Sequence, residues 1–100
     1  MISLAKVVQE ALNNVLKEKH RNGEFIVIKS YERGALKSQR CGVVSVYFKD
    51  IDKNILVYRT RICTIQNSDE QIDFDVFSEA ISHIIVNWDE VWNLINTKPR

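Results

Sequence analysis

The sequence predicts an α+β fold, in which a three-stranded antiparallel sheet carries the N- and C-terminal helices packed on one face. Two observations support this fold class. Residues 3–21 and 73–96 repeat apolar side chains every three or four positions, which is the spacing of a buried helix face. Between them, residues 24–31, 41–49 and 55–65 are rich in the β-branched and aromatic residues that favour strands. The predicted order is therefore α-β-β-β-α.

Length and composition predict a single domain over residues 1–100. The apolar fraction of 45% and the charged fraction of 27% are ordinary for a globular chain with one core. The apolar runs are too short to span a bilayer, and the N-terminus lacks the basic and apolar regions of a secretory signal, so we expect no membrane partner. With two cysteines and no such signal, the expected location is the reducing cytoplasm.

Charge is distributed unevenly along the chain. Residues 1–66 carry 12 Lys or Arg against six Asp or Glu, whereas residues 67–97 carry seven Asp or Glu and no Lys or Arg. Such a separation either neutralises itself within the domain or serves a partner, and the sequence leaves both alternatives open.

The predicted N-terminal helix has a regular pattern with clear ends. Ser3 fits the N-cap position, and Asn22–Gly23 fits a left-handed end after the last turn. Its buried face is predicted to consist of Leu4, Val7, Val8, Ala11, Leu12, Val15 and Leu16.

Three strands and two hairpin connections are predicted to follow. Residues 32–40 are expected to form a long, mobile, basic loop, and residues 50–54 a short turn. If Val44, Val46 and Phe48 face the core, the register of the last two strands pairs Phe48 with Leu56 and Val46 with Tyr58. The same register pairs Cys41 with Cys63. We nevertheless expect free thiols, because a directly paired cross-strand bridge is usually strained and the expected compartment is reducing.

The C-terminal segment is predicted to be helical from an N-cap at Asp73, after a polar connection over residues 66–72. A break near Asn87 is credible, because Asn87 and Glu90 resemble a cap with its acidic partner, so one helix or two remain possible. The apolar stripe of this segment contains Phe74, Phe77, Ile81, Ile84, Ile85, Trp88, Val91, Trp92 and Ile95.

The sheet face turned away from the helices is the first candidate binding surface. It is predicted to carry Phe25, Val27, Lys29, Tyr31, Val43, Ser45, Tyr47, Lys49, Val57, Arg59 and Arg61. Aromatic residues interleaved with cations suit a protein interface, and they equally suit single-stranded nucleic acid, where rings stack on bases and cations meet phosphates. The binding residues proposed on this face are Lys29, Tyr31, Tyr47, Arg59 and Arg61.

The acidic C-terminal segment is the second candidate surface. Its carboxylates, including Asp75 and Glu79, together with Trp88 and Trp92, could dock into a basic and partly apolar groove of another protein. A core helix with a solvated acidic back explains the same residues, and that interpretation is favoured for the two tryptophans.

No motif for catalysis, a metal or a cofactor is present. Two His and two Cys at these separations do not form a zinc site, no glycine-rich phosphate loop occurs, and a structural His83 explains the pattern better than a catalytic one. A cysteine–histidine nucleophile is a third and weaker possibility. We therefore predict no enzyme activity, no cofactor and no metal.

The resulting functional hypothesis is a small, non-catalytic protein-interaction module. It would be a regulator, inhibitor or assembly factor, a class that phages often encode, and would bind a protein partner or itself through the two candidate surfaces. The alternative is a single-stranded nucleic-acid-binding protein that uses the aromatic and basic sheet face.

Overall fold

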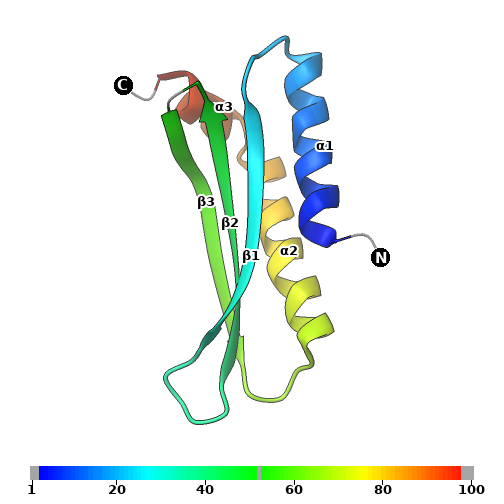
Figure 1. Ribbon diagram of the computed structural model, residues 1–100, viewed down its shortest axis with the longest axis vertical. Helices are drawn as coiled ribbons and strands as arrows, with labels where there is room; N and C mark the ends of the chain where they lie inside the picture. The colour runs from blue at the N-terminus through cyan, green and yellow to red at the C-terminus, as the bar shows by residue number, and fades with distance from the viewer. Residues whose placement is uncertain (1–2, 52, 98–100) are drawn as a thin grey trace.

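A computed structural model describes residues 3–51 and 53–97 and confirms the α+β fold class. Its strands pair antiparallel in the order β1-β2-β3, and all helices lie on one side of the sheet (Figure 1). The elements are α1 (Leu4–Glu18), β1 (Glu24–Arg33), β2 (Arg40–Asp50), β3 (Lys53–Thr64), α2 (Asp69–Val86) and α3 (Trp88–Thr97). None of the helices in these described ranges is both long and apolar enough to cross a membrane.

The N-terminal end of α1 is as predicted, and its C-terminal end is not. The Ser3 hydroxyl accepts a hydrogen bond from the Lys6 backbone N–H at 3.5 Å, as expected for an N-cap. The helix ends at Glu18, before residue 21, because the chain enters the left-handed region at His20 with φ 54°. Gly23 is also left-handed, with φ 114°, and a Cβ there would collide with the Phe48 ring.

The predicted N-cap of the C-terminal segment is wrong, and of the two possibilities left open for this segment, the structure has two helices separated at Asn87. α2 begins one turn before Asp73, because the Ser68 hydroxyl accepts a hydrogen bond from the Gln71 backbone N–H at 3.2 Å. Asp69 and Glu70 then suit the positive end of the helix dipole. Asn87 ends α2 by donating from its side chain to the His83 carbonyl at 3.0 Å, and α3 follows as a second helix.

The hydrophobic core lies between the sheet and the helices. α1 packs on β1, whereas α2 covers β2 and β3, and α3 closes the far end against β3 (Figure 1). Gly42 allows the start of α2 to approach β2 closely, since a Cβ at that position would collide with Ile72. The fully buried side chains include Leu16, Phe25, Phe48, Ile72, Ile84, Ile95, Val44, Val46 and Val76.

The register between β2 and β3 is partly as predicted. Cys41 pairs with Cys63 and Val46 with Tyr58, but a β-bulge between Val46 and Tyr47 shifts the remaining pairs by one residue. Phe48 is therefore opposite Ile55 instead of Leu56. As a result, Leu56 is 47% exposed instead of facing the core, and Ile55 is buried. Val57, predicted on the open face, packs against the core beside Tyr58.

The predicted side-chain directions of β1 are wrong. Phe25 pairs with Phe48, and the alternation of side chains along a strand then places Phe25, Val27, Lys29 and Tyr31 on the side of the helices. The segment Phe25–Ile28 is continuously apolar, so its pattern could not assign faces. Packing decides the matter, because the Phe25 ring meets the Phe48 ring edge-on with centroids 5.6 Å apart.

The connection between β1 and β2 is shorter and more ordered than the predicted loop over residues 32–40. The two strands extend to Arg33 and from Arg40, which leaves residues 34–39 as the loop. Within it, the Gly34 N–H donates to the Gln39 carbonyl at 3.0 Å, and the Gln39 N–H donates to the Leu36 carbonyl at 3.1 Å.

Candidate interaction surfaces

The open side of the sheet retains three of the five residues proposed for it. Tyr47, Arg59 and Arg61 lie there together, because Arg59 pairs with Ser45 and Arg61 with Val43 in the β2–β3 register. From β1, the same side receives aliphatic and polar residues instead of the expected ring and cation, and Leu56 joins them from β3. The members contributed in this way are Ile26, Ile28, Ser30, Glu32 and Leu56.

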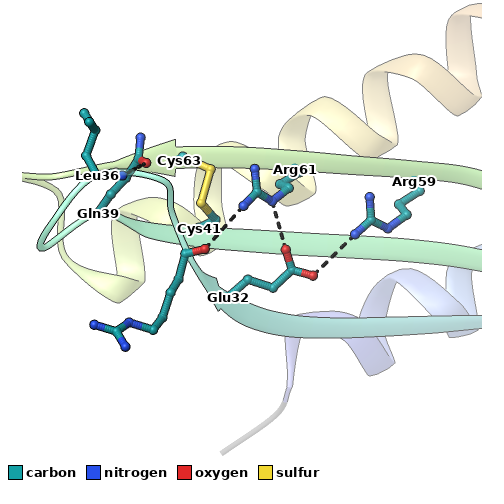
Figure 2. The surroundings of a disulfide bond; sticks show 8 residues. Glu32, Leu36, Gln39, Cys41, Arg59, Arg61 and Cys63 are labelled. Atoms are coloured by element: carbon teal, nitrogen blue, oxygen red, sulfur yellow. Dashed lines mark hydrogen bonds and ion pairs between the residues drawn. A yellow bond between two sulfur atoms is a disulfide. The ribbon is translucent and has the colours of Figure 1, made fainter.

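Both arginines on the open sheet side are paired within the chain. The Glu32 carboxylate accepts from Arg61 Nε at 2.9 Å and lies 3.4 Å from an Arg59 terminal nitrogen (Figure 2). Arg61 also donates to the Arg33 carbonyl at 3.4 Å. A phosphate or a partner carboxylate at this position would have to compete with Glu32, which weakens the case for a nucleic-acid surface.

Beside this network, Cys41 and Cys63 form a disulfide bond, and the expectation of free thiols is wrong (Figure 2). The two residues are directly opposite in the register with Cα atoms 4.0 Å apart, so both side chains leave the sheet on the same side. No cysteine thiol is then available as a nucleophile. The cytoplasmic location stays a prediction, and the disulfide weighs against it, because cytosolic cysteines are normally kept reduced.

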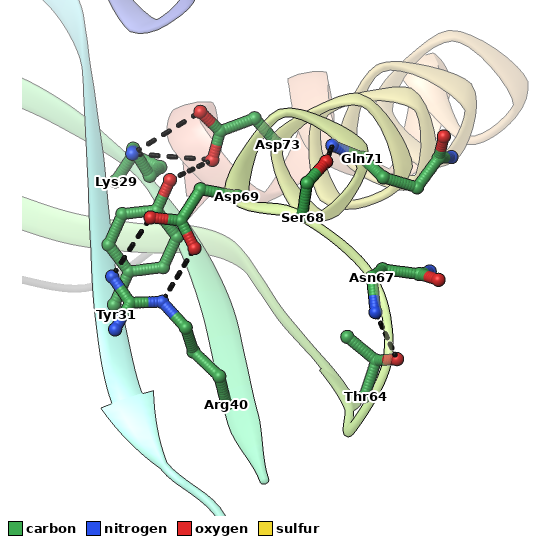
Figure 3. A network of polar contacts seen from close by, with 9 residues as sticks. All are labelled: Lys29, Tyr31, Arg40, Thr64, Asn67, Ser68, Asp69, Gln71 and Asp73. Atoms are coloured by element: carbon green, nitrogen blue, oxygen red, sulfur yellow. Dashed lines mark hydrogen bonds and ion pairs between the residues drawn. The ribbon is translucent and has the colours of Figure 1, made fainter. Parts of the chain in front are cut away.

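Lys29 and Tyr31, which were predicted for the open side, instead contact the start of α2 (Figure 3). The Tyr31 hydroxyl donates to the Asp73 carboxylate at 2.7 Å, and the Lys29 ammonium lies 3.3 Å from the same group. The Tyr31 ring also lies between two cations, with Lys29 Nζ 3.9 Å and the Arg40 guanidinium 4.2 Å from its centroid. These residues therefore attach α2 to β1 and β2, and the Lys29 and Tyr31 side chains are only partly exposed.

The pKa values of Tyr31 and Lys29 are both raised in this cluster. Burial raises the pKa of Tyr31 above its usual 10.0, and the Asp73 carboxylate adds to the rise against the opposing effect of Lys29. Burial alone would lower the pKa of Lys29, but the Tyr31 oxygen and the Asp73 charge outweigh it and raise the value above 10.5. At neutral pH the cluster thus holds a neutral phenol and a charged ammonium.

The acidic C-terminal segment is neutralised in part by the basic strands. Asp73 pairs with Lys29, and Asp69 lies 2.7 Å from Arg40 Nε (Figure 3). Of the proposed binding carboxylates, Asp75 accepts a hydrogen bond from the Gln71 side chain at 2.8 Å, and Glu79 is exposed. Internal neutralisation, one of the two predicted alternatives, is therefore present for Asp69 and Asp73, and a role of the other acids toward a partner stays a prediction.

Trp88 and Trp92 belong mainly to the core, as the favoured interpretation held. Their rings stack with centroids 5.9 Å apart, and Trp88 lies 6.4 Å from the Phe25 ring. Both side chains are only partly exposed and pack against the buried cluster. His83 is likewise structural, since its ring stacks on Tyr58 at 3.9 Å.

The outer face of the helix layer carries a surface that sequence reasoning missed. An apolar groove of about 280 Å³ runs between α1 and α2 and is lined entirely by aliphatic side chains. A second hollow, of about 260 Å³, continues it to Trp88. The lining of the first is Val7, Val8, Ala11, Leu12, Val15, Ile81, Ile84 and Ile85.

Several large apolar side chains stand open to solvent on this helix face. The exposed fraction is 46% for Val7, 68% for Ile85 and 65% for Phe74. The signal was present in the sequence, because the apolar stripe of α2 includes both Phe77 with Ile84 and Phe74 with Ile85, which is too wide for one buried face.

Searches for related proteins give no functional assignment: no family model, curated protein or solved structure matches the chain. Among residues 3–51 and 53–97, no group of three or more His, Cys, Asp or Glu side chains is arranged to hold a metal ion. The surfaces themselves are therefore the basis for a functional proposal.

Proposed function

We propose that this chain is a small, non-catalytic protein-interaction module that binds through the outer face of its helix layer. The apolar groove between α1 and α2 is the observation that carries the proposal. Isolated exposed apolar residues are normal, but a contiguous exposed apolar surface is typical of an interaction site. Here Val7, Ile81 and Ile85 line one groove from two helices and are 46%, 38% and 68% exposed.

This proposal moves the binding site expected from the sequence without changing its class. The open sheet side and the acidic residues Asp75 and Glu79 become secondary, because the arginines of the sheet are paired with Glu32. The shape of the groove suits an amphipathic helix, which lays an apolar stripe between two helices. A role as regulator, inhibitor or assembly factor, and a phage origin, are compatible with such a module.

Site-specific photo-crosslinking in the native cell tests the proposal. A photo-reactive residue replaces Val7 in the groove or, as the control, Glu10 on the exposed side of the same helix. We expect an adduct with a defined protein from position 7 and none from position 10. The adduct should disappear when Ile81→Glu is added, and the purified partner should bind the unmodified chain. Equal adducts from both positions, or adducts indifferent to Ile81→Glu, would refute the proposal.

The nucleic-acid alternative loses most of its support on this face. It relied on Lys29, Tyr31, Tyr47, Arg59 and Arg61 acting together, whereas Lys29 and Tyr31 contact Asp73 on the helix side. Fluorescence anisotropy with a labelled single-stranded oligonucleotide at low salt tests it directly. We expect the unmodified chain and the Arg59→Glu variant to give the same anisotropy. Binding by the unmodified chain that Arg59→Glu abolishes would support the nucleic-acid alternative.

A further inference from the structure

We infer that the partner in the groove is a second copy of this chain, bound by antiparallel crossing of the two α2 helices at Ser78. This inference rests on the proposed function, and it names the occupant of the same site. It starts from a seam along α2 in which Phe74, Ser78, Ile81 and Ile85 recur at steps of four, three and four. That is the spacing by which one helix packs against another.

The same face of one molecule carries both an exposed ring, Phe74, and an apolar groove that could receive such a ring. Phe74, which is 65% exposed, does not line the groove, and the first turns of α2 extend past the N-terminal end of α1 (Figure 1). The groove begins farther along the same helix, where Ile81 and Ile85 face Val7 and Ala11 of α1. One molecule therefore presents an exposed ring at one end of α2 and an apolar groove toward the other end.

A two-fold axis at Ser78 brings the two features together. Phe74 precedes Ser78 by four residues, which is about 6 Å along a helix. In an antiparallel partner, a group about 6 Å before the axis lies at the level of residue 82, between Ile81 and Ile85. Each Phe74 thus enters the groove of the other copy, and the contact repeats by symmetry, as an isologous interface requires. The small side chain of Ser78 allows the helices to approach at the crossing.

The charges favour the antiparallel arrangement over the parallel one. α1 and α2 run in the same direction, so the acidic start of α2 and the basic end of α1 lie at opposite ends of the face (Figure 1). Antiparallel pairing brings Glu70 of one copy toward the end of α1 that carries Lys17 and Lys19 in the other. Parallel pairing would instead place the acidic starts of the two α2 helices together, which is repulsive.

Sedimentation or light scattering of the purified full chain over a range of concentrations tests the inference. We expect a dimer for the unmodified chain. Phe74→Glu and Ile85→Lys should each raise the dimer dissociation constant by about 100-fold or more, because each loss of apolar burial occurs twice in a symmetric dimer. Ile28→Glu is the matched control, since Ile28 is 50% exposed on the open sheet side, and it should leave the dimer intact.

Mixing the two weakened variants separates antiparallel pairing from parallel pairing and from misfolding. In the antiparallel dimer, the new carboxylate of Phe74→Glu meets the new ammonium of Ile85→Lys, and the other Phe74–Ile85 contact is unchanged. The mixture should therefore form heterodimers, although each variant alone is monomeric. Misfolded variants would form no dimer on mixing. In a parallel dimer, the carboxylate at position 74 and the ammonium at position 85 would not lie opposite each other, so mixing would restore no contact. A mixture that stays monomeric overturns the antiparallel interface.

A covalent trap gives an independent readout. Ser78→Cys on the axis should link two copies under mild oxidation, whereas Ser30→Cys on the open sheet side should not. If the unmodified chain is monomeric and Ser78→Cys does not link, self-association is wrong. A defined partner captured at position 7 in the cell would then leave the proposed function standing, and the absence of both results would reject both proposals.

Discussion

The two outward surfaces of this molecule differ in how many of their side chains find a partner within the chain. On the open sheet side, Arg59 and Arg61 pair with Glu32, and Cys41 is bonded to Cys63. On the helix side, Phe74 and Ile85 point into solvent around an apolar groove. The arginines of the open sheet side are thus paired within the chain, whereas the aliphatic side chains around the groove of the helix side are left exposed to solvent.

The first prediction compares the loss of stability at a buried core position with the loss at a position on the open sheet side. Phe48→Ala should lower the free energy of unfolding by about 3–5 kcal/mol, because the buried ring leaves a cavity beside Phe25. Leu56→Ala on the open side, at a position that is 47% exposed, should cost about 1 kcal/mol or less. Urea denaturation measures both. Similar losses would show that the bulge does not turn Leu56 out of the core.

The second prediction concerns the disulfide that supports the open side. The double variant Cys41→Ala and Cys63→Ala should lose about 3 kcal/mol, because a bond across a sequence separation of 22 residues restricts the unfolded chain. Reductant should destabilise the unmodified chain by a similar amount and leave the double variant unchanged. Thiol titration of protein taken directly from the cell also tests the cytoplasmic expectation. Two free thiols without reductant would show that the bond does not form there.

The third prediction uses pH to test the attachment of α2 to the sheet. Because the pKa values of Tyr31 and Lys29 are raised on folding, the stabilisation by their cluster is complete below pH 10.0 and is lost as pH rises through the raised values. Asp73→Asn should cost about 1–2 kcal/mol near neutral pH by weakening the hydrogen bond to Tyr31, and should reduce the alkaline loss.

Unfolding in urea at a series of pH values from neutral to alkaline provides the measurement. Asp75→Asn on the same helix is the control, since Asp75 contacts Gln71 and not the cluster, and its alkaline loss should match that of the unmodified chain. An alkaline loss in Asp73→Asn as large as in the unmodified chain would remove the cluster from this role.

The sequence predicted the three strands and the order of the elements, because helical spacing and β-branched segments are local signals, but it left open whether the C-terminal segment forms one helix or two. It failed on the faces of β1, since Phe25–Ile28 is apolar on both sides and only packing against Phe48 selects Phe25 for the core. It also missed the bulge after Val46, which has no marker residue. One residue of shift was enough to exchange Leu56 and Ile55 between the two sides of the sheet.

The candidate site was mislocated for the same physical reason. Rings and cations are noticed in a sequence, but whether they are free depends on contacts between residues far apart in the chain, such as Tyr31 with Asp73 or Arg61 with Glu32. Aliphatic residues in a helix are assigned to the core by default. The apolar stripe of α2 is wide, and this width was the signal that the helix carries more apolar side chains than the sheet can cover.

The ion pairs of Glu32 are expected to contribute least to stability. Glu32→Gln removes the carboxylate that holds Arg59 and Arg61, and it should lower stability by less than about 1 kcal/mol, because all three side chains are 40–46% exposed. The unfolding of the unmodified chain should depend slightly more on salt than that of the variant. If Glu32→Gln also creates binding to a single-stranded oligonucleotide at low salt, then Glu32 is what keeps the open side from acting as a nucleic-acid surface. If neither stability nor binding changes, the ion pairs contribute nothing, and the difference between the two surfaces rests on the disulfide and the apolar groove alone.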